Sequence, residues 1–161
     1  MRVLDTTTKL RALPDAVVWR GRQEGPLVFT NGVFDLIHPG HVELLEAARR
    51  EGAALVVAVN SDASARRLEK GPGRPVNPAA ARARILAGFA AVDCVVLFDE
   101  DTPLELIQKL CPDVLVKGAD YPPDSIVGAD WMEARGGRLV RVPIVTGYST
   151  TSMVERLRAS T

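Results

Sequence analysis

Two histidines three positions apart, His38 and His41, are the residues whose types and spacing are best suited to chemistry. They follow a strand-like run and stand where an apolar-periodic helix begins, with Pro39 and Gly40 between them. The first turn of a helix presents unpaired backbone amides and the positive end of a dipole, and two imidazoles on one face would add further donors. Gly40 removes a side chain, so a phosphate can approach the backbone. We therefore predict a phosphate-binding helix start.

Either histidine could instead cap the helix or pack inside the protein, and the pair could bind zinc. The pairing of the imidazoles, the glycine between them and the position after a strand favour the phosphate site over a purely structural role. No third ligand stands at a spacing suited to zinc, so the zinc interpretation is weaker.

A second group of residue types that suit phosphate is the segment 147–151, with the sequence GYSTT. Ser149, Thr150 and Thr151 would supply hydroxyls and backbone amides at another helix start, which fits the β and γ phosphates of a nucleoside triphosphate. Serine and threonine also cap helices, and the two roles are compatible.

Basic residues near a glycine-rich stretch could complete such a site. Lys70 stands beside Gly71-Pro72-Gly73, a cluster typical of a mobile loop, and could swing over the phosphates. Arg74 and Arg82 can offer bidentate contacts to phosphate oxygens. The alternatives are a solvated lysine and surface salt bridges.

Apolar runs that alternate with helical patterns must position these residues. They cover residues 27–30, 55–60, 92–98, 114–116 and 139–142. We interpret the runs as apolar on both faces, which is typical of parallel strands covered by helices on either side. The predicted fold is α/β, with a doubly wound parallel sheet of about five strands and a ligand site beyond the carboxyl ends of the strands.

Helix boundaries follow from proline and glycine. His38-Pro39, Asn77-Pro78 and Thr102-Pro103 predict helices with proline at the first helical position, and Gly52 and Pro112 mark helix ends.

Residues 1–26 do not fit the alternation of strands and helices. Within them, residues 6–13 predict a short helix and residues 17–19 a short extended piece. We predict an amino-terminal extension over residues 1–26 and one catalytic domain over residues 27–161.

Composition limits the function classes. The chain has 161 residues, 47% of them hydrophobic, which suits one domain with a real core. Its 20 basic and 20 acidic residues cancel, so neither nucleic acid nor an anionic membrane is an expected partner. Cys94 and Cys111 form no CxxC pair and are expected to be core residues. With no leader and no long apolar run, we expect a cytoplasmic protein.

The residues HPGH at 38–41, their lead-in at 30–35 and the segment 147–151 together resemble the HxGH nucleotidylyltransferase superfamily, whose second motif reads G-x-S-T-T. The resemblance implies a Rossmann-like fold. It also implies an enzyme that transfers a nucleoside monophosphate from a nucleoside triphosphate to a phosphorylated acceptor and releases pyrophosphate.

Further segments are similar to the heptose 1-phosphate adenylyltransferase branch, found fused to a sugar kinase or free-standing. They are residues 58–62, 74–78 and 116–121, with Arg82. The chain is too short to include the kinase, so the free-standing form is expected. The resemblance implies ATP as donor and D-glycero-D-manno-heptose 1-phosphate as acceptor, giving ADP-heptose for lipopolysaccharide or related surface glycans, and it leaves a homodimer open.

Other activities of the same chemistry stay open: cytidylyl transfer to glycerol 3-phosphate and adenylyl transfer to FMN. Glycerol-3-phosphate cytidylyltransferases carry arginine where this sequence has Ile144, which favours ATP over CTP. Ala80-Ala81 departs from the heptose-type pattern, where a more polar pair is expected. A non-catalytic nucleotide-binding module is a third hypothesis, and the intact histidine and serine-threonine motifs argue against it.

The resemblance and the residue types together give the expected roles. His38, His41 and Lys70 are expected to be catalytic, with the histidines at the α-phosphate and the bridging oxygen of the leaving pyrophosphate. The residues expected to bind the nucleotide are Asn31, Gly32, Val33, Phe34, Gly40, Arg82, Lys117, Gly118, Gly147, Tyr148, Ser149, Thr150 and Thr151. Those expected to bind the sugar phosphate are Asp35, Asn60, Asp62, Arg74, Asp120 and Tyr121. Asp35 and Asp120 could instead orient a histidine, a ribose or a metal-bound water, or cap a turn. Mg²⁺ is expected to bridge the triphosphate oxygens, and no protein ligand to it is assigned.

Overall fold

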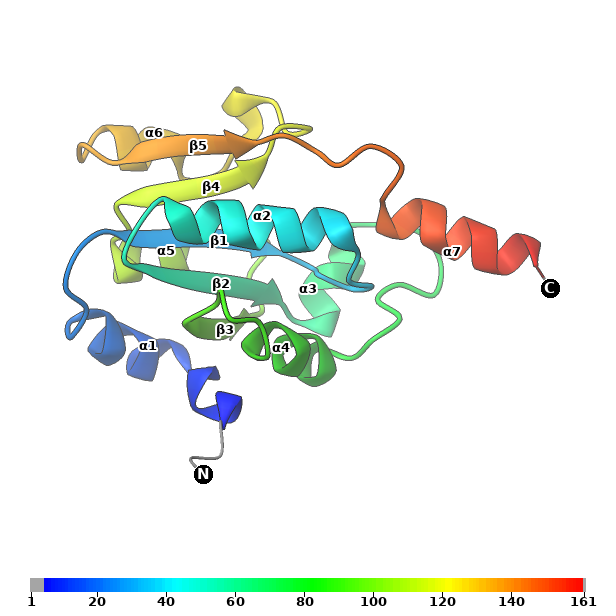
Figure 1. The fold of residues 1–161 in the computed structure, drawn as a ribbon, viewed down its shortest axis with the longest axis horizontal. Helices are drawn as coiled ribbons and strands as arrows, with labels where there is room; N and C mark the ends of the chain where they lie inside the picture. Colours follow the sequence, from blue (N-terminus) through cyan, green and yellow to red (C-terminus); the bar gives the residue numbers. More distant parts are fainter. Residues whose placement is uncertain (1–4, 161) are drawn as a thin grey trace.

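The computed structural model describes residues 5–160, and within them five parallel strands form one sheet in the order β3-β2-β1-β4-β5 (Figure 1). The strands are β1 Leu27–Gly32, β2 Ala54–Asn60, β3 Cys94–Phe98, β4 Val114–Gly118 and β5 Arg138–Val142. The predicted doubly wound parallel sheet is confirmed.

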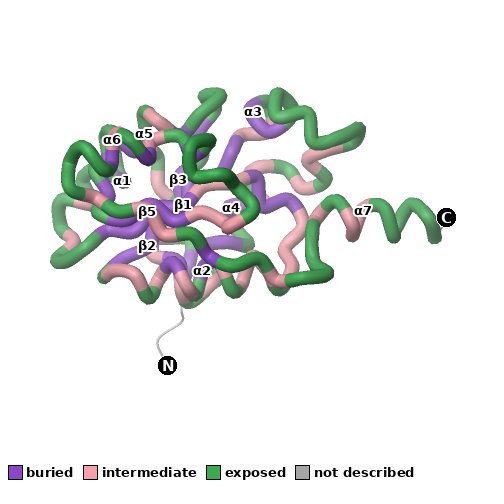
Figure 2. Tube along the Cα trace, turned by 90° about the horizontal axis from the view of Figure 1, so that it is seen from above, coloured by how far each residue is buried: buried purple, intermediate pink, exposed green. Residues whose placement is uncertain are grey.

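Helices cover both faces of the sheet. They are α1 Leu13–Arg20, α2 Pro39–Arg50, α3 Asp62–Arg67, α4 Ala79–Ala87, α5 Leu104–Leu110, α6 Ala129–Glu133 and α7 Thr150–Ala159, with the 3₁₀ turns η1 Thr6–Lys9 and η2 Pro123–Ser125. Helices α2 and α4 pack on one face, and α1, α5 and α6 pack on the other. Helix α7 extends away from the body of the molecule (Figures 1 and 2).

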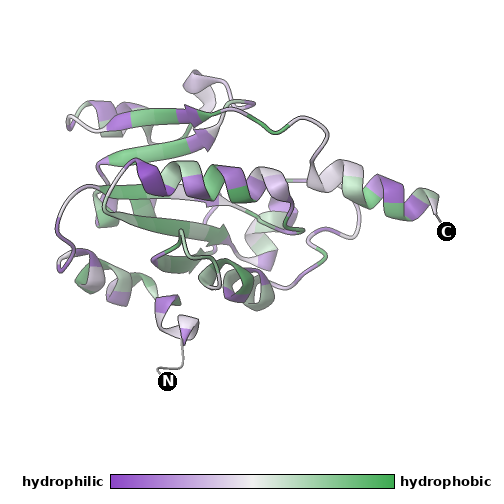
Figure 3. Cartoon of the chain, in the orientation of Figure 1, coloured by the Kyte–Doolittle hydropathy of each residue, from purple (hydrophilic) through white to green (hydrophobic). Residues whose placement is uncertain are grey.

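Alternate residues of each central strand lie in two separate hydrophobic cores, one on each face of the sheet. Val28 and Val57 point into the core beneath α2 and α4, whereas Phe29 and Val56 point into the core beneath α1, α5 and α6. Figure 2 shows the buried residues running through the sheet, and Figure 3 shows that these strands are hydrophobic along their length. The interpretation of all five runs as apolar on both faces is wrong for β5, because this edge strand exposes Arg138 and Arg141.

Helix boundaries agree with the sequence in part. Pro39 is the first residue of α2, as predicted. Pro78 and Pro103 do not start helices: each is the N-cap residue, with backbone angles outside the helical range, and α4 and α5 begin one residue later. Cys94 is buried as expected, but Cys111 is exposed because it ends α5 in a left-handed conformation with φ of 45°.

The amino-terminal segment differs from its predicted elements. Residues 17–19 are helical within α1, not extended, and Ala16 on the same helix is fully buried in the core. The expected helix over residues 6–13 is only the turn η1, because Leu10 leaves it to form a bridge with Val95 beside β3.

The chain runs outward from β1 to β3 and then returns across β1 to β4, so the direction of winding reverses between β1 and β4. In sheets of this kind the crevice at that reversal, beyond the carboxyl ends of the strands, is where ligands bind. In the described part of the chain, no helix is long and apolar enough to cross a membrane.

Candidate active site

A cavity of about 320 Å³ lies at the carboxyl ends of β1 and β4, where the fold predicts a ligand site. Most residues that the sequence singled out line it: Asn31, Gly32, Val33, Phe34, Asp35, His38, Gly40, His41, Lys70, Arg74, Lys117, Gly118, Asp120, Tyr121, Tyr148, Ser149, Thr150 and Thr151. Asn60, Asp62, Arg82 and Gly147 are not part of its lining. Below, we call this space the main cavity.

The main cavity also has walls that the motifs did not indicate. They are Leu44 and the segment 142–145, whose Ile144 had been noted only for nucleotide choice. The position of this segment after the last strand run is the signal that could have found it.

The two histidines form a stacked pair at the start of α2. Their ring centroids are 3.8 Å apart, with 28° between the planes. The backbone amide of His38 donates a hydrogen bond to Nδ1 of His41 at 3.3 Å. Because this nitrogen accepts, a neutral His41 carries its proton on Nε2. His41 thus caps the helix through one nitrogen and keeps a donor on the other.

Burial keeps this pair uncharged. Burial, as the main cause, together with the nearby His38 and Lys70 lowers the pKa of His41 to about 4. Burial also lowers the pKa of His38. Both histidines line the main cavity as neutral side chains near pH 7. Nδ1 of His38 is buried and has no hydrogen-bond partner among the described residues.

Gly40 leaves room for the His38 ring. A Cβ at this position would lie 3.0 Å from Cε1 and Nδ1 of the His38 ring, closer than ordinary van der Waals contact. Any larger residue would therefore push the His38 ring away from its stacked position over His41.

A second helix start faces the same cavity, at the beginning of α7. Ser149 is its N-cap, and its hydroxyl accepts a hydrogen bond from the Ser152 amide at 3.0 Å. Thr150 donates from Oγ1 to the Leu36 carbonyl at 3.3 Å, which ties this helix start to the loop before His38. Gly147, with φ of 87°, forms the preceding turn. Two helix amino termini therefore point into one space, an arrangement that suits a polyphosphate.

Lys117 is a half-buried cation of the site. Its Nζ donates to the Asn31 carbonyl at 2.9 Å and lies 5.1 Å from the centroid of the Tyr121 ring. Burial, as the main cause, and the nearby Lys70 lower its pKa to about 8, although Asp120 opposes the shift. Two cations near one another, beside neutral histidines, leave this wall of the cavity favourable to an anion.

Asp35 and Arg74 line the cavity, but they bind each other. The Asp35 carboxylate accepts from Arg74 Nε at 2.7 Å, from the Val76 amide at 2.8 Å and from the Asn77 amide at 2.9 Å. Burial alone would raise the pKa of Asp35, but these two amides and the arginine outweigh it and lower the pKa. The carboxylate therefore anchors the chain before α4.

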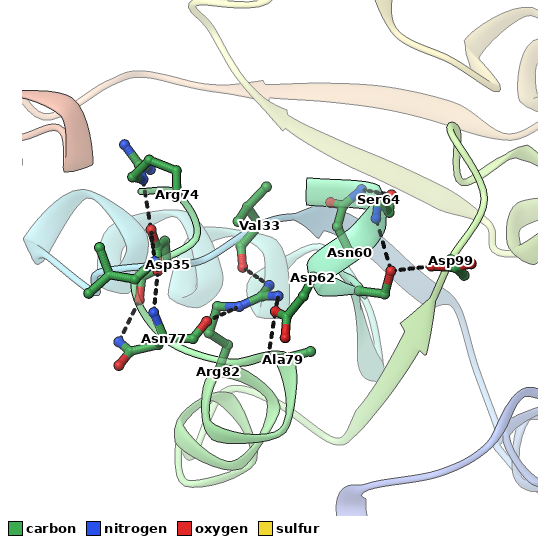
Figure 4. A network of polar contacts seen from close by, with 12 residues as sticks. Val33, Asp35, Asn60, Asp62, Ser64, Arg74, Asn77, Ala79, Arg82 and Asp99 are labelled. Atoms are coloured by element: carbon green, nitrogen blue, oxygen red, sulfur yellow. Dashed lines mark hydrogen bonds and ion pairs between the residues drawn. The ribbon is translucent and has the colours of Figure 1, made fainter. Parts of the chain in front are cut away.

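Arg82 and Asp62 form an ion pair outside the lining of the main cavity (Figure 4). Arg82 is fully buried and donates to the Val33 carbonyl at 2.6 Å, the Asn77 carbonyl at 2.9 Å and Asp62 Oδ1 at 2.8 Å. Asp62 also accepts from the Ala79 amide at 2.9 Å. In the structure both residues bind groups of the protein and neither lines the main cavity, so their expected ligand contacts stay predictions. Asn77, which the sequence indicated only as a helix-start residue within the segment 74–78, is a partner of both Arg82 and Asp35.

A smaller hollow of about 170 Å³ adjoins the main cavity. The two share six lining residues, which are Asn31, Gly32, Val33, Lys70, Lys117 and Tyr121. Asn60 belongs to the smaller hollow, and its side-chain amide donates to Ser64 Oγ at 2.9 Å. Oδ1 of Asn31 is buried and has no partner among the described residues. Below, we call this smaller hollow of about 170 Å³ the side hollow.

A family model described as "Cytidylyltransferase-like" matches residues 29–156. The chain belongs to this family, and its resemblance to the HxGH superfamily is confirmed. Among curated proteins, it is similar to the Bifunctional protein HldE of Gluconobacter oxydans, with 57% identity over 139 residues, which is 86% of this chain and 29% of that protein. The HldE of Mesorhizobium japonicum is 54% identical over 158 residues, which is 98% of this chain and 31% of that protein.

The chain therefore spans less than a third of the length of these relatives. Among solved structures, it is similar to the lipopolysaccharide core biosynthesis protein from Thermoplasma volcanium, with a TM-score of 0.64 and 26% identity over 78% of this chain and 100% of that one.

Proposed function

We propose that this chain transfers AMP from ATP to a heptose 1-phosphate, giving ADP-heptose and pyrophosphate for a surface glycan or lipopolysaccharide. The observation that carries the proposal is the pair of helix starts, α2 with its histidines and α7 with Ser149, which face one cavity at the reversal of the sheet. The HldE relatives and the lipopolysaccharide core protein support the acceptor class, together with the heptose-type segments 58–62, 74–78 and 116–121.

The chemistry requires no strong base. The acceptor's phosphate oxygen is already anionic and attacks the α-phosphorus, forming one P–O bond while the bond to the bridging oxygen breaks and pyrophosphate leaves. His41 contributes a donor on Nε2, fixed there because its Nδ1 accepts from the His38 amide. A neutral, fixed donor stabilises charge that develops on the phosphate oxygens without reorganising during the reaction.

The side hollow is the proposed place for the sugar. Lys70 and Lys117 stand where it joins the main cavity, so an acceptor phosphate bound there lies next to the donor's phosphates. The hollow combines polar groups of Asn31 and Asn60 with an apolar wall that includes Ile126. Hydroxyls and C–H groups of a sugar ring fit such a mixed lining.

Mg²⁺ is the proposed divalent ion, and it would arrive with ATP. The described residues contain no group of three or more His, Cys, Asp or Glu side chains that could hold a metal by themselves. Asp120, a carboxylate on the cavity wall, is the side chain best placed to hold an ion carried by the triphosphate. The ion would neutralise phosphate charge. We place the reaction in the cytoplasm, where ATP is supplied.

A pyrophosphate-release assay tests the proposal. ATP and CTP are each offered with heptose 1-phosphate, glycerol 3-phosphate and FMN, and we expect turnover with ATP and heptose 1-phosphate. ATP is expected to be preferred because Ile144, on the wall of the main cavity, stands where the cytidylyl branch has arginine. Preference for CTP with glycerol 3-phosphate would move the chain to that activity, and nucleotide binding without any turnover would favour a non-catalytic module.

A further inference from the structure

The short segment before α4, which contains Asn77, is held by hydrogen bonds at two points of the loop that follows β1 (Figure 4). At the first point, the Asp35 carboxylate accepts from the Asn77 amide at 2.9 Å, and the Asn77 side-chain amide donates back to the Asp35 carbonyl at 2.9 Å. At the second point, Arg82 donates to the Asn77 carbonyl and to the Val33 carbonyl, at 2.9 and 2.6 Å. Asn77 is therefore bound through its amide, its carbonyl and its side chain.

Phe34 lies between the two hydrogen-bonded residues Val33 and Asp35, and its backbone conformation is one that residues with a side chain rarely adopt. Its φ is 50°, in the left-handed region. Such a residue persists where its surroundings hold it. Here the carbonyl of Val33 before it is bound by Arg82, and the carboxylate of Asp35 after it is bound by the segment before α4.

The conformation of Phe34 places its ring beside a catalytic candidate. The Phe34 ring centroid is 5.4 Å from that of His41, with 54° between the planes. On its other side, the ring lies so close to Gly32 that a Cβ there would be 3.1 Å from it. The ring is thus wedged between the end of β1 and the imidazole, so a change in the Phe34 backbone would change the support of His41.

We propose that Arg82 is a positioning residue for His41, acting through the Val33 carbonyl, Asn77 and the Phe34 ring. The catalytic part of this proposal rests on the proposed nucleotidylyl transfer, whereas its structural part does not. Direct binding of a phosphate by Arg82 is disfavoured by the geometry. The side chain has 0% exposure and lies outside the main cavity lining, and its ion pair with Asp62 also secures the Ala79 amide at the start of α4.

The test compares Arg82→Lys with Arg84→Lys, a control two residues further along the same helix. Arg84 binds the Thr6 hydroxyl at 2.8 Å and is not part of either hollow. Three quantities are measured: the His41 imidazole NMR resonances without ligand, the ATP dissociation constant by calorimetry, and kcat for pyrophosphate release. Lysine cannot span three acceptors, so Arg82→Lys should shift the His41 resonances and lower kcat by about 10²-fold while ATP affinity is retained. Arg84→Lys should leave all three quantities unchanged.

Two outcomes would overturn the proposal: unchanged ligand-free His41 resonances in Arg82→Lys, or ATP affinity that falls in step with kcat, as for a direct phosphate contact. If the parent protein shows no turnover but the His41 resonances still move, the positioning holds and the proposed function fails. Should Arg82→Lys not fold, Asn77→Ala removes the donor to the Asp35 carbonyl and leaves Arg82 in place. We expect it to shift the same resonances, and their constancy would equally refute the proposal.

Discussion

His41 combines two tasks in one ring. Its Nδ1 accepts the His38 amide and so completes the start of α2, which leaves Nε2–H as the donor. The sequence posed capping and phosphate binding as alternatives, but the arrangement allows both at once. That outcome depends on which nitrogen faces the backbone, and this cannot be inferred from spacing.

His41→Ala is expected to lower kcat for pyrophosphate release by about 10²–10³-fold, because one donor to the developing charge is lost. The helix also loses its cap contact, so thermal unfolding is followed in parallel to confirm that the variant is folded. Glu43→Ala, an exposed position on the same helix, is the control and should retain activity. Turnover of folded His41→Ala within a few-fold of the parent would show that the histidine assignment is wrong.

Arg82 shows where reasoning from residue types reaches its limit. An arginine in a phosphate-binding protein suggests a phosphate contact, but this one is fully buried and satisfied by two carbonyls and a carboxylate. Its partners at positions 33, 62 and 77 are far apart in sequence. Only the packing of α4 against the loop after β1 brings them together, and periodicity contains no such information.

At the scale of elements, the sheet could be predicted because parallel strands buried on both faces leave continuous apolar runs. Helix starts were harder. Pro78 and Pro103 precede helices as expected, but an N-cap proline and a first-turn proline have the same sequence pattern and differ only in backbone angle. The edge strand β5 and helix α1 were misread in detail because tertiary contacts, not local pattern, set their exposure and conformation.

The loop over residues 68–76 is an element without regular structure, and we predict that it closes over bound nucleotide. Lys70 lines both hollows, and Gly71 and Gly73 have φ of 109° and 72°, which permits hinge motion. A triphosphate would give Lys70 an anionic partner that the ligand-free state lacks, and this difference can shift a population. Hydrogen exchange at residues 68–76 should slow on addition of ATP and Mg²⁺.

The variant Lys70→Ala distinguishes closure of the loop over nucleotide from an effect on the stability of the fold. Lys70→Ala should lower kcat while leaving the free energy of unfolding without nucleotide nearly unchanged, since Lys70 is exposed. Unchanged exchange in the loop of the parent, with ATP shown to be bound, would mean that the segment is only a connector.

For the whole molecule, the half-buried histidines predict sensitivity to acid. In the unfolded chain a histidine binds a proton below its ordinary pKa of 6.5, whereas His41 in the folded protein does so only near pH 4. Proton uptake therefore favours the unfolded state between these values, and the free energy of unfolding should fall by about 1–2 kcal/mol as the pH drops from 6.5 to 4. Denaturant unfolding at several pH values measures it.

The control for acid sensitivity is His41→Gln. In this variant the free energy of unfolding should fall less steeply between pH 6.5 and 4 than in the parent. Asp35, whose pKa is lowered, adds its own loss of stability only at lower pH, as its carboxylate is protonated and releases its partners. An identical pH dependence in parent and His41→Gln would assign the acid sensitivity to other groups.

Helix α7 has ten residues and none of them is buried, yet its first turn forms part of the cavity wall. A helix of this length is marginal by itself, so its order depends on its contacts, which are those of its first turn at the cavity and a hydrogen bond from Arg158 to the Pro72 carbonyl at 2.9 Å. An anion at that end stabilises the first turn. Because helix formation is cooperative, a more stable first turn also stabilises the turns that follow it. The order of α7 should therefore report how much of the protein has a triphosphate bound in the main cavity. Its amide protection should rise in proportion to the fraction of protein that holds a triphosphate, even at turns too distant to touch it.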